Sequence, residues 1–565
     1  SKLSSYINKY LLSDILGDEL EVRFGTNWRN PITKIDFNSV IQKFKSLGFN
    51  MKNTQGDYHL NIQNEYTNPK SGEILLSNIR TEIHGLHNIQ NYCKTNSFKF
   101  EDIPTYITFT QKTAKYDKNM KLPPIDYYDF EFRVNYKSEK KLAGKFAIIQ
   151  NMLQAWNSSK KTFRLIKRFT FIHDKYPLKI DCSIVKSSKK YPRSNRFIPE
   201  FRIETSNIFN NKEEYEVEIE LMKESNFPTN KPLKDQNDIM LYYLRKTIKN
   251  TLSALQNSNF PISYDEQNII LNDYMKILYK NKPPNRRIRS GDFIGPSSIS
   301  LEVENIRADN TDLNVPNIRD HYTVTDKADG MRKLLYIHKS GKCYLIDVNM
   351  KVQFSGNICD EPKYFGTIID GEHIIHGKEG KYINIYAAFD IYYLHKDDIR
   401  HHPFYNIPME ETKEETSKKK GLYRLEELSK TISNMKIIPF IGKIPPLKIN
   451  RKTFNYGSGN DIFQKCNIIL DKQKKNLFEY EIDGLILTPC NKGVGSNKIG
   501  EILEPRKITW KHSMKWKPPE FNTVDFLVTT KKIETGEEFI GTLFEDGSNL
   551  SKGTNTLKYL DMNLD

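Results

Sequence analysis

Two features that define whole classes of proteins are missing from this sequence. It has no run of about 18 apolar residues, so no membrane-spanning helix is predicted. Its six cysteines are scattered, and none belongs to a Cys-x-x-Cys pair. The sequence therefore indicates neither a disulfide framework nor a zinc site, and a reducing compartment fits its cysteine content.

Acidic residues are too few to balance the basic ones. The chain has 86 Lys and Arg against 70 Asp and Glu, which gives a formal net charge of +16 and a pI of about 9.1. This excess favours a polyanionic partner, nucleic acid first. An AT-rich genome, which inflates Lys, Asn and Ile, is the alternative explanation. At 565 residues the chain is too long for one core, so two to four domains are expected.

Polar and apolar residues alternate in many short segments of the first 225 residues, which is the pattern of β-strands. A single strand of this kind is usually half-solvated, with its apolar face inward. Several strands with both signs of charge on the polar face instead predict a closed antiparallel barrel with a charged interior. Such a barrel needs helices or a neighbouring domain over its apolar outside. The segments concerned are 19–24, 78–83, 108–112, 129–136, 162–171, 179–185 and 215–221.

The polar faces of these strands supply the groups that phosphate hydrolysis requires. Hard oxygen ligands for Mg²⁺ or Mn²⁺ are predicted from Glu19, Glu21, Glu218 and Glu220. A metal ion and cationic side chains together would stabilise the charge that develops on a hydrolysed phosphoryl group. The predicted triphosphate-binding residues are Arg80, Lys112, Glu131, Arg133, Arg168 and Asp181.

An ordered set of motifs carries a family resemblance for about residues 1–225. The set is Glu19-Leu20-Glu21, Ile79-Arg80-Thr81-Glu82-Ile83 and Glu216-Val217-Glu218-Ile219-Glu220. It resembles the triphosphate tunnel metalloenzymes, the metal-dependent RNA 5′-triphosphatases of fungal and large DNA-virus capping systems. The resemblance implies a tunnel in which both glutamate clusters bind the metal and basic residues hold the triphosphate.

The second half of the chain contains a candidate nucleophile. Lys327-Ala328-Asp329-Gly330, followed by Arg332, places an amine near a carboxylate and a guanidinium, although so short a motif can be an ordinary polar turn. Each of the segments that follow it could also be a turn or a strand end, but their occurrence together indicates one site. They are Asp370-Gly371-Glu372, Phe389-Asp390, Asp483-Gly484-Leu485-Ile486 and Lys515-Trp516-Lys517-Pro518.

These residue types can perform a covalent nucleotidyl transfer. After losing its proton, Lys327 would attack the α-phosphorus of a nucleoside triphosphate and expel pyrophosphate. Lys515 and Lys517 would contact the α-phosphate and offset the charge of the transition state. Glu372 and Asp483 would bind the ribose or the metal. The predicted nucleotide-binding set is completed by Phe389, stacked on the base, and by Asp329 and Arg332.

The order and spacing of these segments resemble the covalent nucleotidyltransferase superfamily of mRNA-capping guanylyltransferases and nucleic-acid ligases. Within it, Lys515-Trp516-Lys517-Pro518 and Phe293-Ile294-Gly295-Pro296 look like the capping guanylyltransferases. The resemblance covers about 290–520 and implies an ATP-grasp-like ligase/guanylyltransferase fold that forms a lysyl-GMP intermediate. In one departure, Ile346-Asp347-Val348 stands where the family often has Asp-Arg, which puts the ribose contact of that arginine in doubt.

We therefore expect an α+β multidomain enzyme. Residues 1–260 would form the RNA 5′-triphosphatase barrel, 285–520 the guanylyltransferase domain and 521–565 the beginning of an OB-fold lid. One half would remove the γ-phosphate of 5′-triphosphate RNA, and the other would transfer GMP from GTP to the diphosphate end. Relatives from large DNA viruses imply a cytoplasmic location, in a viral factory or virion, and a methyltransferase domain or subunit as partner. The alternatives are an ATP-dependent RNA or DNA ligase with an accessory N-terminal domain, and a catalytically inactive RNA-end-binding protein.

Overall fold

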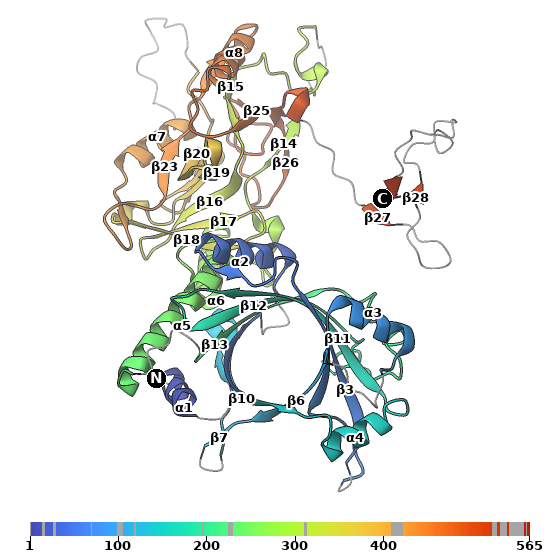
Figure 1. Ribbon diagram of the computed structural model, residues 1–565. Coiled ribbons are helices and arrows are strands. Elements are labelled where there is room, and N and C mark those ends of the chain that lie inside the picture. Colours follow the sequence, from blue (N-terminus) through green and yellow to red (C-terminus); the bar gives the residue numbers. More distant parts are fainter. Residues whose placement is uncertain are drawn as a thin grey trace, which may run out of the picture.

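The computed structural model has two domains, joined by helices α5 (Leu233–Leu255) and α6 (Tyr264–Leu278) (Figure 1). Among the described residues, no helix is both long and apolar enough to cross a membrane. The structure describes residues 2–13, 17–25, 30–68, 71–98, 105–117, 120–194, 196–223, 230–309, 314–407 and 422–521, with short strands between 528 and 564.

Eight antiparallel strands form the N-terminal barrel, which Figure 1 shows end-on. Each strand pairs with the next, and β3 pairs back with β11, so the barrel is closed as predicted. In order around it lie β11 (Lys161–Ile172), β12 (Leu178–Ser187), β13 (Glu214–Leu221), β1 (Asp18–Phe24), β10 (Phe132–Leu142), β6 (Ile107–Ala114), β5 (Ile79–His84) and β3 (Asp57–Thr67). Short strands β2 (Asn50–Met51), β4 (Ile74–Leu76) and β9 (Ile125–Tyr127) pair with β11, β3 and β10, and β7 (Tyr116–Asp117) pairs with β8 (Met120–Lys121).

Helices cover the outside of the barrel on two sides. Helices α1 (Lys2–Leu12), α2 (Lys34–Ser46) and α5 pack against the apolar faces of β1, β10, β12 and β13, where Val22, Val134 and Ile219 are buried. A second core lies under α3 (Leu86–Thr95) and α4 (Ala147–Gln154). Each fully buried aliphatic side chain contributes roughly 1.5–3 kcal/mol, which helps to offset the cost of gathering charges inside.

The predicted strand over 129–136 is wrong in its first part. Tyr128–Phe130 forms a 3-10 turn, Glu131 has a left-handed φ of 52°, and β10 begins only at Phe132. Because this turn interrupts the alternation, Glu131 is not on the inward face. Its carboxylate instead accepts a hydrogen bond from Asn30 Nδ2 (2.9 Å) and lines a cleft between the domains.

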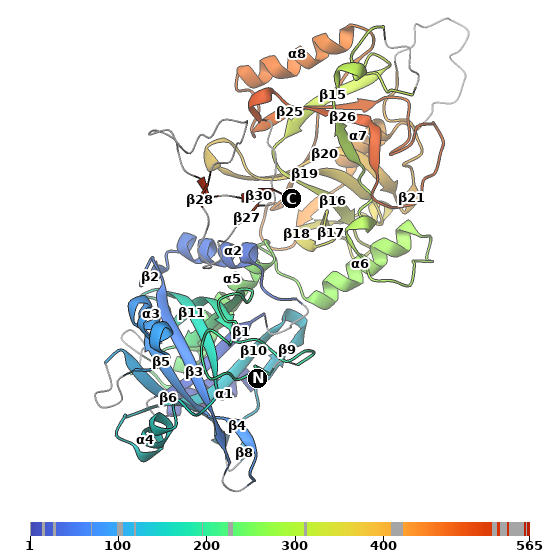
Figure 2. The same cartoon turned by 90° about the vertical axis from the view of Figure 1, so that its right-hand side faces the viewer.

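The C-terminal domain is built on two sheets. One has the order β14 (Ser297–Ser300), β26 (Thr509–Trp516), β25 (Ile482–Pro489), β15 (Tyr322–Ala328) and β24 (Asn455–Gly457). The other has the order β21 (Asp397–Asp398), β20 (Tyr382–Leu394), β19 (Ile368–His376), β16 (Met331–Ile337), β17 (Lys342–Asp347), β18 (Val352–Cys359) and β22 (Ile437–Pro439), with β23 (Lys448–Arg451) beside β20. Helices α7 (Arg424–Asn434) and α8 (Asp461–Lys474) complete the domain (Figure 2).

The predicted OB-fold lid falls mostly outside the described residues. Within it, β27 (Val528–Thr530) pairs with β30 (Met562–Leu564), and β28 (Ile540–Gly541) pairs with β29 (Tyr559–Leu560). The lid and the boundaries at 260, 285 and 521 stay predictions.

Candidate active sites

A cavity of about 300 Å³ lies between the two sheets of the C-terminal domain. Both sheets contribute to its wall, so residues distant in sequence meet there. The predicted nucleophile Lys327 on β15 lines it, with four of the predicted nucleotide-binding residues: Arg332 on β16, Glu372 on β19, Phe389 on β20 and Lys515 on β26.

Lys327 is held by a carboxylate from the neighbouring strand. Its Nζ donates to Asp483 Oδ1 (2.7 Å) and Oδ2 (3.0 Å), and Lys517 Nζ lies 2.7 Å from Oδ2. Burial by itself would raise the pKa of Asp483, but the hydrogen bonds from the two lysines hold it below its usual value. The pairing of β15 with β25 shifts register between Asp326 and Ala328, and such an irregularity re-aims a side chain at the edge of a site.

Gly484 permits the close approach of β25 and β26. Its φ is +149°, and a Cβ at this position would lie 2.0 Å from the carbonyl oxygen of Trp516. Any other residue would push β26 away, and Lys517 with it. The Asp483-Gly484 motif therefore has a backbone role beside its charged one.

Arg332 is fixed on the opposite wall of the cavity. Its guanidinium donates to Asp370 Oδ1 (3.2 Å) and Oδ2 (2.5 Å) and to the carbonyl of Pro296 (2.6 Å). The same group lies over the rings of Phe293 and Phe389, at 5.7 and 5.6 Å from their centroids. The arginine thus orients Phe389, the residue predicted to stack on the base.

Lys452 lines the cavity and was not predicted from the sequence. It follows β23 without any recognisable motif, and only the packing of β23 beside β20 brings it to the site. Its Nζ lies 3.0 Å from Asp326 Oδ2. Burial raises the pKa of Glu372 to about 7, against the lowering influence of Lys452 and Arg332. Near neutral pH, the Glu372 carboxylate can therefore take up a proton or bind a cation at little cost in free energy.

The structure does not bring Asp329 into the cavity. Its side chain is exposed in the turn between β15 and β16, and it is absent from the cavity wall. A turn residue between two antiparallel strands points to solvent, which a linear motif does not reveal. Asp347 belongs to the segment Ile346-Asp347-Val348, which stands where the resembling family often has Asp-Arg. It lies in the cleft between the domains.

A buried ion pair supports the cavity from behind. Asp390 lines the cavity, and its oxygens accept from Arg424 Nε (2.9 Å) and Nη2 (3.1 Å). Arg424 is fully buried, and burial raises the pKa of Asp390 despite this partner. The pair was not foreseen, because no sequence motif marks Arg424.

We expect Arg424→Met to destabilise the C-terminal domain by about 3–5 kcal/mol, because it leaves the buried carboxylate of Asp390 without its cation. Urea denaturation of the full chain measures this loss. Adding Asp390→Asn should recover much of it, whereas Arg451→Met, at an exposed position, should cost little. A loss of the same size in the Arg451 variant would contradict this account of the pair.

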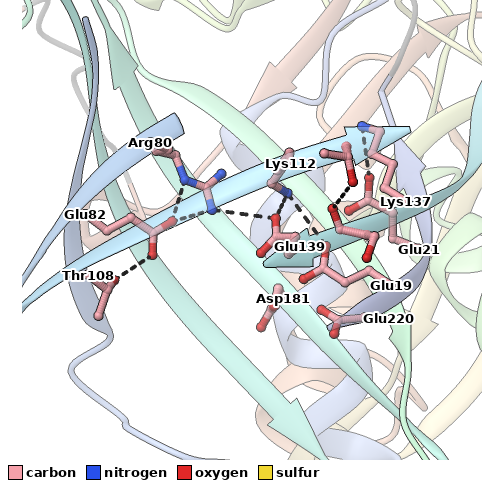
Figure 3. Close-up of polar contacts among 12 residues, drawn as sticks. Glu19, Glu21, Arg80, Glu82, Thr108, Lys112, Lys137, Glu139, Asp181 and Glu220 are labelled. Carbon is pink, nitrogen blue, oxygen red and sulfur yellow. Dashed lines mark hydrogen bonds and ion pairs between the residues drawn. The ribbon is translucent and has the colours of Figure 1, made fainter. Parts of the chain in front are cut away.

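Charged side chains of both signs line the interior of the barrel (Figure 3). Lys112 forms an ion pair with Glu139 and lies 3.7 Å from Glu19. Arg80 pairs with Glu82 and lies 3.6 Å from Glu139. Glu139 was missed because β10 runs beyond the predicted end of its strand at 136. Other interior charges that were not predicted as site residues are Arg23, Lys137, Arg164, Lys179 and Glu216.

The predicted convergence of four glutamates on one ion is not seen. Glu21 faces Glu220 across the β1–β13 pair, but Glu218 faces Arg23, with 2.7 Å between Arg23 Nε and its Oε1. Within the described part of the chain, no group of three or more His, Cys, Asp or Glu side chains is arranged to hold a metal ion. Strand register explains the difference, because it sets Glu218 against Arg23, the next inward residue of β1.

The donor chemistry nevertheless fits a hard cation near Glu19, Glu21 and Glu220. Burial raises the pKa of Glu220 to about 7, although Lys179 Nζ lies only 2.8 Å from its Oε2. Burial also raises the pKa of Glu19, against the influence of Lys112. These carboxylates lack enough positive charge nearby, and a divalent cation would supply it.

The remaining predicted ligands lie on the inward face with defined partners. Arg133 pairs with Asp126 at 2.6 Å, and its side chain is 43% exposed. Arg168 lies 3.8 Å from Asp181 Oδ2, and Thr170 donates to Asp181 Oδ1 at 2.5 Å. Arg168, which its carboxylate holds only loosely, can exchange that partner for phosphate oxygens.

Sequence comparison relates the C-terminal domain to a known family. Residues 258–511 match the family model of the mRNA capping enzyme catalytic domain. The match to this catalytic domain includes Lys327, Glu372, Phe389 and Asp483, and stops just before Lys515.

Two curated relatives agree with this match. The chain is 24% identical over 560 residues to a probable mRNA-capping enzyme of Acanthamoeba polyphaga mimivirus, covering 89% of this chain and 43% of the relative. It is 27% identical over 264 residues to an mRNA-capping enzyme of Caenorhabditis elegans, covering 42% of this chain and 36% of the relative. The chain thus spans less than half the length of the curated relatives it matches.

A solved structure also matches the barrel segment weakly. The RNA triphosphatase Pct1 of S. pombe is 12% identical, covers 43% of this chain and 86% of its own, and has a TM-score of 0.25. That score is too low to carry an argument, so the barrel fold rests on the strand pairing itself.

Proposed function

We propose that this chain carries out two consecutive steps of mRNA capping. The barrel removes the γ-phosphate from 5′-triphosphate RNA, and the C-terminal domain transfers GMP from GTP to the resulting diphosphate end. The similarity to proteins named mRNA-capping enzymes supports this function. One observation carries it: the same chain contains a closed, charge-lined barrel and a lysine held by a carboxylate at the wall of a cavity.

The transfer step follows from the contacts of Lys327. Its Nζ attacks the α-phosphorus of GTP, a P–N bond forms, and the bond from that phosphorus to the bridging oxygen breaks to release pyrophosphate. Asp483, 2.7 Å away, is placed to accept the proton that Lys327 must lose. Lys515 and Lys517 offset the negative charge that develops on the phosphoryl group. An oxygen of the RNA diphosphate then attacks the same phosphorus and frees Lys327.

The hydrolysis step uses the cations of the barrel interior. Arg80, Lys112 and Arg168 bind phosphate oxygens and orient the γ-phosphate for attack by water. Glu19, Glu21 and Glu220 would hold Mg²⁺ or Mn²⁺, which polarises the phosphoryl group when bound. The methyltransferase partner and the cytoplasmic location stay predictions.

Labelling with α-³²P nucleotides followed by denaturing electrophoresis tests this function. A covalent adduct from GTP alone is expected, with γ-phosphate release from triphosphate RNA in the same preparation. An adduct from ATP alone would identify a ligase instead. No adduct and no phosphate release would identify a catalytically inactive RNA-end-binding protein.

A further inference from the structure

A cleft of about 970 Å³ lies between the two domains and adjoins the nucleotide cavity. Arg332 and Glu372 line this cleft and also line the nucleotide cavity, so the two spaces adjoin. The cavity itself measures about 300 Å³. If the smaller space takes one nucleotide, the larger one has room for a short chain of them.

The other end of the cleft lies at a mouth of the barrel. Gly25 follows the last residue of β1, and Glu131 precedes the first residue of β10, and both line the cleft. Because Phe24 pairs with Phe132, these two positions lie on the same rim of the barrel. Arg23 and Arg133, the next pair inward, place two guanidinium groups just inside that mouth. Figure 2 shows β9 and the start of β10 on the side of the barrel that faces α6.

The lining of the cleft offers cationic and polar groups to a polar chain, beside the carboxylates of Asp36, Glu131, Asp347 and Glu372. Lys333 is only 3% exposed, and its Nζ contacts Gln353 Oε1 (2.6 Å) and His373 Nδ1 (2.9 Å). Throughout the described ranges, no carboxylate forms an ion pair with it, and Asp347, which favours its charged form, lines the same cleft. Tyr264 and the exposed amides of Asn268 and Asn272 form the α6 side, where they offer stacking and hydrogen-bonding groups.

We propose that this interdomain cleft binds the 5′-terminal nucleotides of the RNA acceptor. The RNA would run from the mouth of the barrel, where its γ-phosphate is removed, to the cavity where Lys327 carries GMP. This inference rests on the proposed function and adds to it a substrate path between the two sites. The phosphates would meet Lys333 and the arginines of the rim, and bases would contact the α6 side.

Introducing negative or positive charges on α6 tests the path without changing a residue of either active site. Asn268 and Asn272 are one helical turn apart, exposed and polar, so substitution there should preserve the fold. We expect N268E/N272E to weaken binding of a ten-nucleotide 5′-diphosphate RNA about tenfold in fluorescence anisotropy at low salt. N268K/N272K should tighten binding. It should also steepen the slope of the logarithm of the binding constant against the logarithm of the salt concentration, by about 0.7 for each added phosphate contact. Gln90→Glu, on the remote helix α3, is the matched control and should change nothing.

Covalent GMP labelling of the same preparations separates this inference from the proposed function. Opposite effects of the glutamate and lysine pairs on RNA binding support the cleft, even if no lysyl-GMP forms. Equal RNA binding by both pairs, with normal lysyl-GMP formation, would overturn the cleft and leave the two activities in place. The difference in binding between the glutamate and lysine variants should be smaller for a dinucleotide acceptor than for the longer RNA. An equal difference for the two acceptors would also contradict the path.

Discussion

Replacing Lys327 by arginine should abolish covalent GMP attachment while γ-phosphate release continues. Arginine keeps its proton in proteins and cannot act as the nucleophile, so the adduct should fall to background, a loss of at least about a thousandfold. The substitution is mild for the fold, because a guanidinium can still donate to Asp483 as Lys327 Nζ does at 2.7 Å. Incubation with α-³²P GTP and electrophoresis under denaturing conditions measures the adduct.

Two comparisons make this result specific. Phosphate release from triphosphate RNA should stay near the wild-type rate, because the barrel contains none of the cavity residues. Lys430→Arg, at a side chain that is 61% exposed on α7, should leave labelling unchanged. Retained labelling in a folded Lys327→Arg protein would mean that another residue carries the nucleotide.

Removing one carboxylate from the barrel should produce the converse result. We expect Glu21→Ala and Glu220→Ala each to reduce metal-dependent γ-phosphate release by about two orders of magnitude or more, because each deletes an oxygen donor for the cation. Lysyl-GMP formation should be unchanged, which separates this loss from misfolding. Phosphate release over a range of Mg²⁺ and Mn²⁺ concentrations, alongside GMP labelling, measures both activities.

A control from the same strand and a binding measurement sharpen the test. Glu214→Ala removes a carboxylate that is 51% exposed at the start of β13 and should keep the wild-type rate. Mn²⁺ should raise the melting temperature of the wild type more than that of the two variants, since a ligand that binds only the native state stabilises it. Wild-type release and equal stabilisation in both variants would show that these glutamates only balance the barrel's cations, and the tunnel interpretation should then be dropped.

Much of the barrel is predictable from the alternation of polar and apolar side chains along its strands. In 215–221, three glutamates alternate with Val217 and Ile219, and β13 places the two sets on opposite faces. Period-two alternation is local, because it follows from the geometry of a single strand. The exception at Glu131 is equally instructive, since its left-handed conformation keeps this residue out of β10 and no pattern in the sequence marked it.

The cavity was predictable to the extent that its residues belong to short linear motifs. Lys327, Glu372, Phe389 and Asp483 each stand in such a motif, and the structure brings all four to one site. Lys452 and Arg424 have no motif, and they reach the site only because β23 and α7 pack against β20. Contacts of this kind depend on which elements become neighbours, and that information is spread over the whole chain.

The sequence by itself therefore determined which side chains carry charge, which strands alternate and in what order the motifs occur. Tertiary structure decided which charges neutralise each other. Glu218 and Glu220 look equivalent in the sequence, but strand register sets one against Arg23 and the other against Glu21. The tertiary structure also decided that the rim of the barrel and the nucleotide cavity share one cleft, because two helices hold the domains together. Pairing and docking depend on the burial of surfaces far apart in the chain, which no local pattern records.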